Sequence, residues 1–453
     1  MNRAAVVARA ASGALGMLLL ATACRKPPGD SPARKVNASV SPPAVAAAAP
    51  PAPAPRLAPE TPPRPLRRCF PERPAWVDAP VADLLDRAAD LFDEGDYAGA
   101  LGCAEEGARQ APRSVEAHHN RAIALLHLDR LDEARDALAL ALALAPDDPE
   151  TLEAGADLYI NQLPPSADRS LLGLEYARRG SRRVSQRDLQ RKARLALLEG
   201  QALIDLGRSA EAVRRLDASL AAAPNVAAAQ YEKGVALFEL CRFEEAHRVF
   251  QQVLSGDSEH AHALYHLGLI EERLGDEEAA RQHLAAATAE DPKAFPAPLP
   301  VTQADFAARV RQAVEALPAD VRRDLAGIPV EAADLPAGDD LTAEKPPLSP
   351  TILGLFRGLP LDFDAHEPPA TSPTKAGRAG KGKTAIDAPA GGAAAKCAPA
   401  DVPNRAIALY RRNILRTVRT SQELDQAISR TLLHEVGHLR GEDDGSLRDR
   451  GLE

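Results

Sequence analysis

Apolar residues recur at helical spacing close to the end of the chain. They follow one another at intervals that keep them on a single helix face, and they comprise Leu424, Ala427, Ile428, Leu432 and Val436. Ser421 can cap this helix, and Glu423 places an acidic residue in its first turn. The pattern therefore predicts one amphipathic helix that begins near Ser421 and includes Val436.

The middle of the chain repeats with a period of 34 residues. Residues that interrupt helices recur with this step: Pro112 and Pro146, and then Pro224, Ser258 and Pro292. Small residues recur with the same step in two series, namely Ala88, Ala122, Gly200, Gly234 and Gly268, and Ala100, Ala134, Ala212, Ala246 and Ala280. Small side chains let two helices approach closely, so the period indicates stacked helix pairs.

This pattern resembles the tetratricopeptide repeat, and it implies about six repeats over residues 79–294. The stretch from Pro146 to Pro224 is 78 residues, ten more than two repeats, and we place the excess in a loop at 163–167. Stacked repeats form a concave groove that usually binds extended peptides or helices. A protein partner in this groove is expected, and an array that serves only as a structural scaffold is the alternative.

Composition narrows the class of protein. The 453 residues leave room for two or three domains. The net charge of −9 argues against a nucleic-acid-binding protein, which would show a concentrated basic face. We therefore expect no nucleic-acid partner.

The N-terminal sequence predicts an export signal. Residues 1–23 combine early arginines with a short apolar run at 10–20, which is too short to span a bilayer as a stable helix. The residues before Cys24 resemble a bacterial lipobox, which implies lipid attachment at Cys24, and Arg25 favours the outer membrane of the cell envelope. An ordinary cleaved signal with an incidental cysteine is the alternative. Residues 24–78 are rich in Pro and Ala and predict an extended spacer.

Four further cysteines show no metal-binding spacing. They are Cys69, Cys103, Cys241 and Cys397. An oxidising compartment permits disulfides, and Cys69 with Cys103 is the only pair that is close in sequence. We keep that disulfide as one possibility and otherwise expect buried or unreactive thiols.

The candidate chemistry lies on the C-terminal helix, in the motif HEVGH. His434 and His438 are four residues apart, so both imidazoles lie on one helix face and can reach one zinc ion. Glu435 is placed to act as general base toward water. Gly441 can end the helix and reverse the chain, which would bring Asp444 back as a third ligand. Two histidines and a carboxylate leave a position open, as a catalytic zinc site requires. A chance match on a surface helix is the alternative.

The last 150 residues also resemble the minimal zincin-like metallopeptidases. The resemblance rests on residues 306–363 and 402–453, and above all on the ending HExxHxxGxxD. It implies a small α+β domain with His434, His438 and Asp444 as zinc ligands and Glu435 as catalytic base. It also implies that residues 406–410 form the edge strand along which an extended substrate lies. The metzincin branch is excluded, because its methionine turn is missing: Met1 and Met17 are the only methionines.

Two other patterns carry no function in this interpretation. His262 and His266 are also four residues apart, but neither a glutamate nor a third ligand accompanies them, so we expect surface or groove histidines. Residues 377–384 fit the phosphate-loop pattern GxxxxGK[ST], but Pro and Gly break the strand and helix that such a loop requires. We expect no nucleotide binding. The segment 364–401 reads as a solvated basic loop, with contact to acidic lipid or cell-wall polymers as the alternative.

Together these patterns predict a mainly α protein in four parts. A lipoprotein signal at 1–23 and a linker at 24–78 precede a helical-repeat solenoid at 79–294 and a small α+β domain at 300–453, with an insertion at 364–401. The predicted function is a Zn²⁺-dependent metallopeptidase that hydrolyses peptide bonds of envelope proteins and uses its repeats to bind a client or partner. A scaffold lipoprotein with a vestigial zinc domain is the rival.

Overall fold

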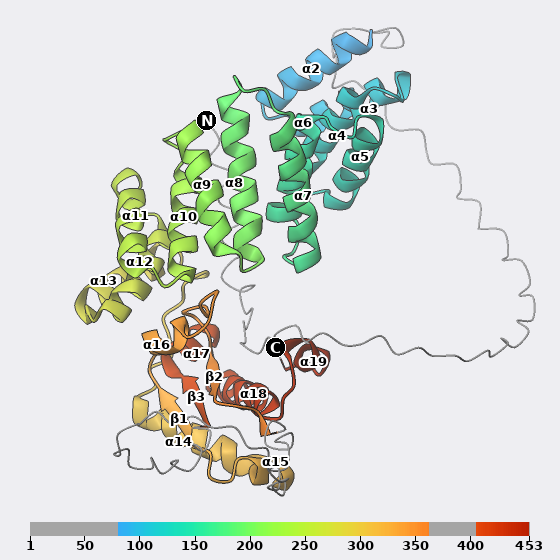
Figure 1. Ribbon diagram of the computed structural model, residues 1–453. Coiled ribbons are helices and arrows are strands. Elements are labelled where there is room, and N and C mark those ends of the chain that lie inside the picture. The colour runs from blue at the N-terminus through green and yellow to red at the C-terminus, as the bar shows by residue number, and fades with distance from the viewer. Residues whose placement is uncertain (1–79, 362–404, 453) are drawn as a thin grey trace, which may run out of the picture. The chain divides into compact units, whose positions relative to one another are not determined.

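The computed structural model describes residues 80–361 and 405–452, and these form a mainly α fold (Figure 1). The predicted signal, Cys24, the spacer and the phosphate-loop pattern all lie outside the described residues. No helix in the described part of the chain is long and apolar enough to span a bilayer. The described residues fall into two compact units, one ending at Leu158 and the other beginning at Tyr159.

The first unit consists of antiparallel helices joined by short turns. They are α2 (Val81–Asp93), α3 (Tyr97–Gln110), α4 (Val115–His127), α5 (Leu131–Leu144) and α6 (Pro149–Asp157). Asp96, Ser114 and Asp148 cap three of them by accepting backbone N–H bonds. Ala88 and Ala122, from the repeated small positions, are 2% and 0% exposed. Small side chains at these positions let neighbouring helices pack closely, as the period indicates.

One cysteine of this unit forms a disulfide, which is one of the two alternatives kept from the sequence. Cys103 is fully buried and disulfide-bonded. Cys69, the partner considered from the sequence, lies outside the described residues. Cys241, in the second unit, is free and partly buried, and burial raises the pKa of its thiol to about 11.

The second unit also begins with stacked helices. After a π-helical turn at Leu158–Gln162 come α7 (Ala167–Arg183), α8 (Leu189–Asp205), α9 (Ser209–Ala222), α10 (Ala227–Glu239), α11 (Phe243–Gly256), α12 (Ala261–Leu274) and α13 (Glu277–Glu290). The recurring glycines sit where a partner helix presses close. A Cβ at Gly200 would lie 2.6 Å from Leu216, and one at Gly234 would lie 2.7 Å from Phe250. The glycine series therefore reflects helix contact rather than turns.

The ten additional residues of the third and fourth repeats lie mostly away from the predicted loop. The loop at 163–166 is one residue longer than its counterpart at 128–130. By contrast α7 and α8 each contain 17 residues, whereas α9, α11 and α13 contain 14. The 34-residue period reveals how many residues are added but not where they lie. Longer helix ends leave the packing between repeats unchanged, so the repeated positions on either side keep their places.

The C-terminal part of the second unit is a small α+β assembly. Its elements are α14 (Gln303–Ala316), α15 (Ala319–Asp324), β1 (Val330–Ala333), α16 (Gly338–Thr342), β2 (Gly354–Arg357), β3 (Ala406–Tyr410), α17 (Arg411–Thr417), α18 (Ser421–Leu439) and α19 (Asp444–Asp449). One face of the sheet packs on α14 and α18 through an apolar core that includes Phe306, Ile407 and Leu432. The other face packs on Leu341 and Leu348, with Cys241 and Phe243 of the repeats beside them.

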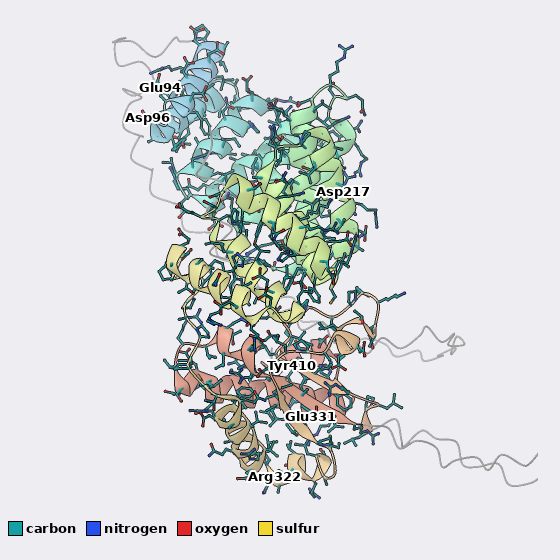
Figure 2. All side chains as sticks on the ribbon, turned by 90° about the vertical axis from the view of Figure 1, so that its left-hand side faces the viewer. Glu94, Asp96, Asp217, Arg322, Glu331 and Tyr410 are labelled. Carbon is teal, nitrogen blue, oxygen red and sulfur yellow. The ribbon has the colours of Figure 1, made fainter. Side chains whose placement is uncertain are left out.

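The order of the strands corrects one expectation. The sheet has the order β1-β3-β2, with β3 parallel to β1 and antiparallel to β2. All five residues of β3 are buried, and Tyr410, labelled in Figure 2, is 0% exposed. Ala406–Tyr410 is therefore the central strand, and the prediction that it forms the substrate-binding edge is wrong. Among the described strands β2 lies at the edge that contacts α18.

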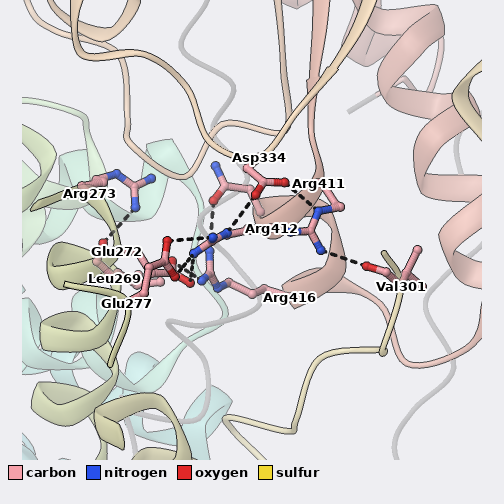
Figure 3. Close-up of polar contacts among 10 residues, drawn as sticks. Leu269, Glu272, Arg273, Glu277, Val301, Asp334, Arg411, Arg412 and Arg416 are labelled. Carbon is pink, nitrogen blue, oxygen red and sulfur yellow. Dashed lines mark hydrogen bonds and ion pairs between the residues drawn. The ribbon is translucent and has the colours of Figure 1, made fainter. Parts of the chain in front are cut away.

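Arginines of α17 connect this assembly to the last repeat (Figure 3). Arg412 pairs with Glu272 at 3.1 Å and with Glu277 at 2.8 Å, and Arg416 also pairs with Glu272. Glu272 is only 7% exposed in its side chain, so this charge is held by two guanidinium groups. On the same helix, the buried Asn413 donates to the carbonyl oxygens of Pro350 and Ile352, just before β2.

Candidate metal centre

The helix α18 (Ser421–Leu439) carries the site, and its cap lies one residue before the predicted one. The Thr420 Oγ1 atom accepts the Glu423 N–H at 3.2 Å, and the Glu423 carboxylate accepts the Arg419 N–H at 2.6 Å. The first bond is an N-cap, so Thr420 rather than Ser421 is the cap, and the second bond ties Arg419, the residue before the cap, to the first turn. The Ser421 hydroxyl instead accepts a bond from Arg309 at 2.9 Å.

The predicted apolar face of α18 anchors the motif in the core. Leu424, Ile428, Leu432 and Val436 are each at most 2% exposed. They pack against α14 and the sheet, which fixes the rotation of the helix about its axis. The motif residues His434, Glu435 and His438 are consequently buried as well, at 1%, 0% and 6% exposure.

The structure brings His434, His438 and Asp444 together. The two Nε2 atoms are 3.0 Å apart, and Asp444 Oδ1 lies 3.8 Å from Nε2 of His434 and 3.4 Å from Nε2 of His438. Ligands bound tetrahedrally at about 2.0–2.1 Å are separated by about 3.3 Å, and the three observed distances bracket that value. In the described part of the chain these residues form the one group of three such side chains whose ligand atoms lie within 4.8 Å.

Backbone carbonyls determine the tautomer of both histidines. His434 Nδ1 lies 2.8 Å from the Leu452 oxygen, and His438 Nδ1 lies 3.0 Å from the Glu442 oxygen. A carbonyl only accepts, so each Nδ1 carries the proton, and in the neutral imidazole Nε2 then presents a lone pair. Two lone pairs 3.0 Å apart beside a carboxylate repel one another unless a cation lies between them. The donor set therefore fits a divalent metal ion.

A close helix contact brings Asp444 to the site. Gly441 adopts φ +86°, in the left-handed region that favours glycine, so the chain reverses there as the sequence predicts. The short helix α19 then packs Leu447 against α18 at Gly437, where a Cβ would lie 2.2 Å from Leu447 Cδ2. Asp444 is the first residue of α19, which Asp443 caps through the Ser446 N–H. The glycine inside HEVGH thus allows the third candidate ligand to approach.

Glu435 is buried beside the three candidate ligands and contacts β2. Its Oε2 atom accepts the Phe356 N–H at 2.7 Å, while Oε1 makes no hydrogen bond to any described residue. Burial raises the pKa of Glu435 to about 7, against the opposing effects of His438 and of the Phe356 amide. Gly354 makes room for this carboxylate, since a Cβ there would lie 2.9 Å from Oε1 and 2.7 Å from Thr431 Cγ2.

Several residues that shape the site were not singled out from the sequence. They are Gly354, Phe356, Gly437, Leu447 and the carbonyl groups of Glu442 and Leu452. Gly437 could have been recognised from the sequence, because a glycine inside an amphipathic helix lowers helix stability and therefore indicates a close packing contact. The carbonyl groups could not, since every residue has one.

The second histidine pair, expected from the sequence on the surface or in the groove, packs among aromatic rings of the repeats. His266 stacks on Phe250 with ring centroids 5.0 Å apart, and His262 lies edge-on to Phe295 at 4.7 Å. Both belong to α12 of the repeat array and pack among aromatic rings. The assignment of His434, His438 and Asp444 as ligands and of Glu435 as base stays a prediction, now with a geometry that fits it.

Comparison with known families agrees with the two resemblances. A family model described as zincin-like metallopeptidase matches residues 389–452, and a tetratricopeptide repeat model matches residues 85–149, 197–246 and 240–295. The chain thus combines tetratricopeptide repeats with a zincin-like C-terminal segment, and its fold is mainly α with a small three-stranded sheet. These matches confirm the predicted family resemblances and fold class.

Several solved structures are similar to part of this chain. PilW, a type IV pilus biogenesis factor, shares 21% identity over 47% of this chain and 94% of its own, with a TM-score of 0.42. Pseudomonas aeruginosa PilF shares 16% identity over 47% and 92%, with a TM-score of 0.41. YrrB, described as having an unusual peptide-binding site, shares 18% identity over 42% and 92%, with a TM-score of 0.34. No curated protein matches the chain.

Proposed function

We propose that the C-terminal segment is a zinc-dependent peptidase whose metal is held by His434, His438 and Asp444. The observation that carries the proposal is the close grouping of the two Nε2 atoms, 3.0 Å apart, with a carboxylate oxygen 3.4 Å from one of them. Zinc at this position would supply Lewis acidity toward a carbonyl oxygen and would acidify water. The possible peptidase activity suggested by the family match agrees with this donor set.

Glu435 is the group that would move protons. Its pKa of about 7 places the carboxyl near the balance between its two forms at neutral pH, which suits a general base that later acts as an acid. The Phe356 N–H holds one carboxylate oxygen and leaves Oε1 to exchange the proton. In peptide hydrolysis Glu435 would take a proton from water and give it to the leaving amine.

The open edge of β2 is the surface that would hold the substrate. Residue pairing with β3 occupies one side of β2, where the Tyr410 N–H donates to the Leu353 oxygen at 2.8 Å. The Phe356 N–H points the other way, toward Glu435. An extended peptide that added to this edge would run directly past the catalytic carboxylate. The proposed substrate strand is therefore β2, in place of Ala406–Tyr410.

The remaining parts of the proposal concern partners and location. The repeats would bind a client or a partner protein in their groove, in keeping with the protein-binding role that tetratricopeptide repeats indicate. Export, lipid attachment at Cys24 and residence at the outer membrane rest on the N-terminal sequence alone. On this proposal the substrates are proteins of the bacterial cell envelope.

The Glu435→Gln variant tests the proposal. It keeps the shape of the side chain and the bond from Phe356 but cannot carry the proton, so zinc content should be unchanged while cleavage of an unfolded protein is lost. Glu315→Gln, on the exposed side of α14, is the matched control and should cleave like the wild type. Zinc-loaded wild type without cleavage, or a Glu435→Gln variant as active as the wild type, would favour the scaffold with a vestigial zinc domain.

A further inference from the structure

The segment that leads into β2 is held by residues of the repeat array. The thiol of Cys241, just after α10, donates to the Leu348 carbonyl oxygen at 3.8 Å. Arg273, in the last turn of α12, donates from one terminal guanidinium nitrogen to the Pro350 oxygen. Residues 348–350 therefore lie against the repeats at the point where the chain approaches β2.

The repeats also fix the position of the Arg273 side chain. Its other terminal nitrogen donates to the Leu269 oxygen of the same helix at 3.0 Å (Figure 3). Its guanidinium carbon lies 5.6 Å from the ring centroid of Phe238 and 5.9 Å from that of Phe243. A planar cation held over two aromatic rings has little freedom to turn. The bond to Pro350 thus comes from a donor whose place is set within the array.

Apolar packing presses the same segment onto the sheet without setting its exact place. Leu348 and Ile352 are each 5% exposed and belong to the core on the face of the sheet away from α18. Burial of apolar surface is non-directional, so it favours contact but not one position of the chain along the strand. Directional hydrogen bonds at Pro350 supply that position.

The Pro350 carbonyl is the point where the repeats and the site meet. It accepts a second bond at 3.0 Å from Asn413, which also donates to the Ile352 oxygen at 2.7 Å. Six residues further along, the Phe356 N–H donates to Glu435 Oε2 at 2.7 Å. A displacement at the first carbonyl moves this N–H unless the short chain between them bends.

We propose that Arg273 is a positioning residue for Glu435. It would hold the Pro350 carbonyl, and with it the entry to β2, whose Phe356 N–H holds the carboxylate. The last repeats would then form part of the catalytic unit, in addition to any partner that they bind. The effect on hydrolysis rests on the peptidase activity proposed above, whereas the placement of β2 does not.

Hydrogen exchange of the full chain tests the placement of β2 without reference to activity. Arg273→Met removes the bond to Pro350 and keeps an apolar side chain beside the two aromatic rings. Backbone amides of 351–357, including that of Phe356, should then exchange about 10-fold faster, the usual effect of losing a hydrogen bond from a charged donor. Amides of 424–432 in α18 should keep the wild-type rate, which general destabilisation would not allow.

Kinetics test the consequence for catalysis. Arg273→Met should lower kcat at least about 10-fold at unchanged zinc content, because small displacements of a catalytic group have costs of that order or larger. Arg273→Lys, which keeps the charge and a donor for Pro350, should restore most of the loss in both measurements. Arg281→Met, the same change at an exposed arginine of α13, is the control and should match the wild type in both.

Each outcome decides the proposal. Unchanged exchange over 351–357 in Arg273→Met, or equal acceleration in α18, overturns it, and so does a normal kcat in a variant with faster exchange. If the wild type hydrolyses no peptide, the proposed function fails, and the exchange rates alone decide whether Arg273 places β2. If Arg273→Met does not fold, judged by circular dichroism, the milder change Arg273→Gln is measured in its place with the same expectations.

Discussion

Leu447 packs against Gly437 so closely that a Cβ on the glycine would lie 2.2 Å from the leucine Cδ2 atom. This contact holds α19, and with it Asp444, against the two histidines of α18. The metal centre thus depends on the close packing of the Leu447 side chain on Gly437. Gly437→Ala should displace Leu447, and α19 with it, because the fully buried leucine side chain has little room to move aside.

The predicted effect of Gly437→Ala is a loss of metal affinity. We expect zinc to bind about 10–100-fold more weakly, as is typical when the groups that orient ligands are displaced. Equilibrium dialysis against a competing chelator measures this. Gly445→Ala is the control, because a Cβ there would meet only Asp443 Oδ1 at 3.5 Å, an ordinary contact. Equal affinities for the two variants would refute the role assigned to Gly437.

A second prediction separates metal binding from catalysis. Gly354→Ala would place a methyl group 2.9 Å from Glu435 Oε1 and push the carboxylate away, while His434, His438 and Asp444 keep their places. Zinc content should therefore stay at the wild-type level, and kcat should fall at least about 100-fold, because small displacements of a catalytic group have costs of that order. Gly338→Ala, with open space around its Cβ, should retain activity.

Local pattern predicted some parts of this structure and missed others for identifiable reasons. The α18 face and the 34-residue period were readable because helical and repeat periodicities are local. The position of β3 was not, because it depends on pairing Val330 with Ile407 across most of the domain and its insertion. The helix cap is Thr420 rather than the predicted Ser421. The Ser421 hydroxyl instead accepts a hydrogen bond from Arg309, which lies more than a hundred residues earlier in the chain.

The candidate site also has parts that the local sequence predicts and parts that it does not. The helix places His434 and His438 through spacing alone, and the glycine at 441 allows the reversal that returns Asp444. The approach of Gly354 to Glu435 could not be predicted, because it joins strand and helix across 81 positions. Such a contact is decided by how the sheet stacks on α18 rather than by any local sequence preference.

A third prediction concerns the junction between the last repeat and α17. Glu272→Gln removes a buried charge and leaves Arg412 and Arg416 facing each other without their shared partner. The free energy of unfolding should fall by about 3 kcal/mol, the usual cost of breaking a buried ion pair from one side. Denaturant titration measures it.

The neighbouring Glu277 supplies the control for that experiment. Its side chain is 60% exposed although it also pairs with Arg412, so Glu277→Gln should cost less than about 1 kcal/mol. Similar losses for the two variants would mean that the Glu272 charge is not buried between the arginines.

A fourth prediction concerns pH. Burial lowers the pKa of His266 from 6.5 to about 4 in the folded protein. Below about pH 6.5 the His266 side chain takes up a proton in the unfolded chain but not in the folded chain. The free energy of unfolding therefore falls as the pH falls toward 4. The loss is at most about 3 kcal/mol, since one pKa unit corresponds to about 1.4 kcal/mol. Denaturant titrations at several pH values should show that the free energy of unfolding falls less with acid for His266→Gln than for wild type. Parallel curves of this free energy against pH would contradict the assignment.

The central claim is that peptide hydrolysis depends on zinc at His434, His438 and Asp444. Its most direct test is cleavage of an unfolded protein measured while zinc is returned stepwise to the metal-free chain. The account predicts that activity rises with bound zinc and reaches its maximum at one ion per chain. Full activity in the metal-free protein, or none at full zinc occupancy, would contradict it.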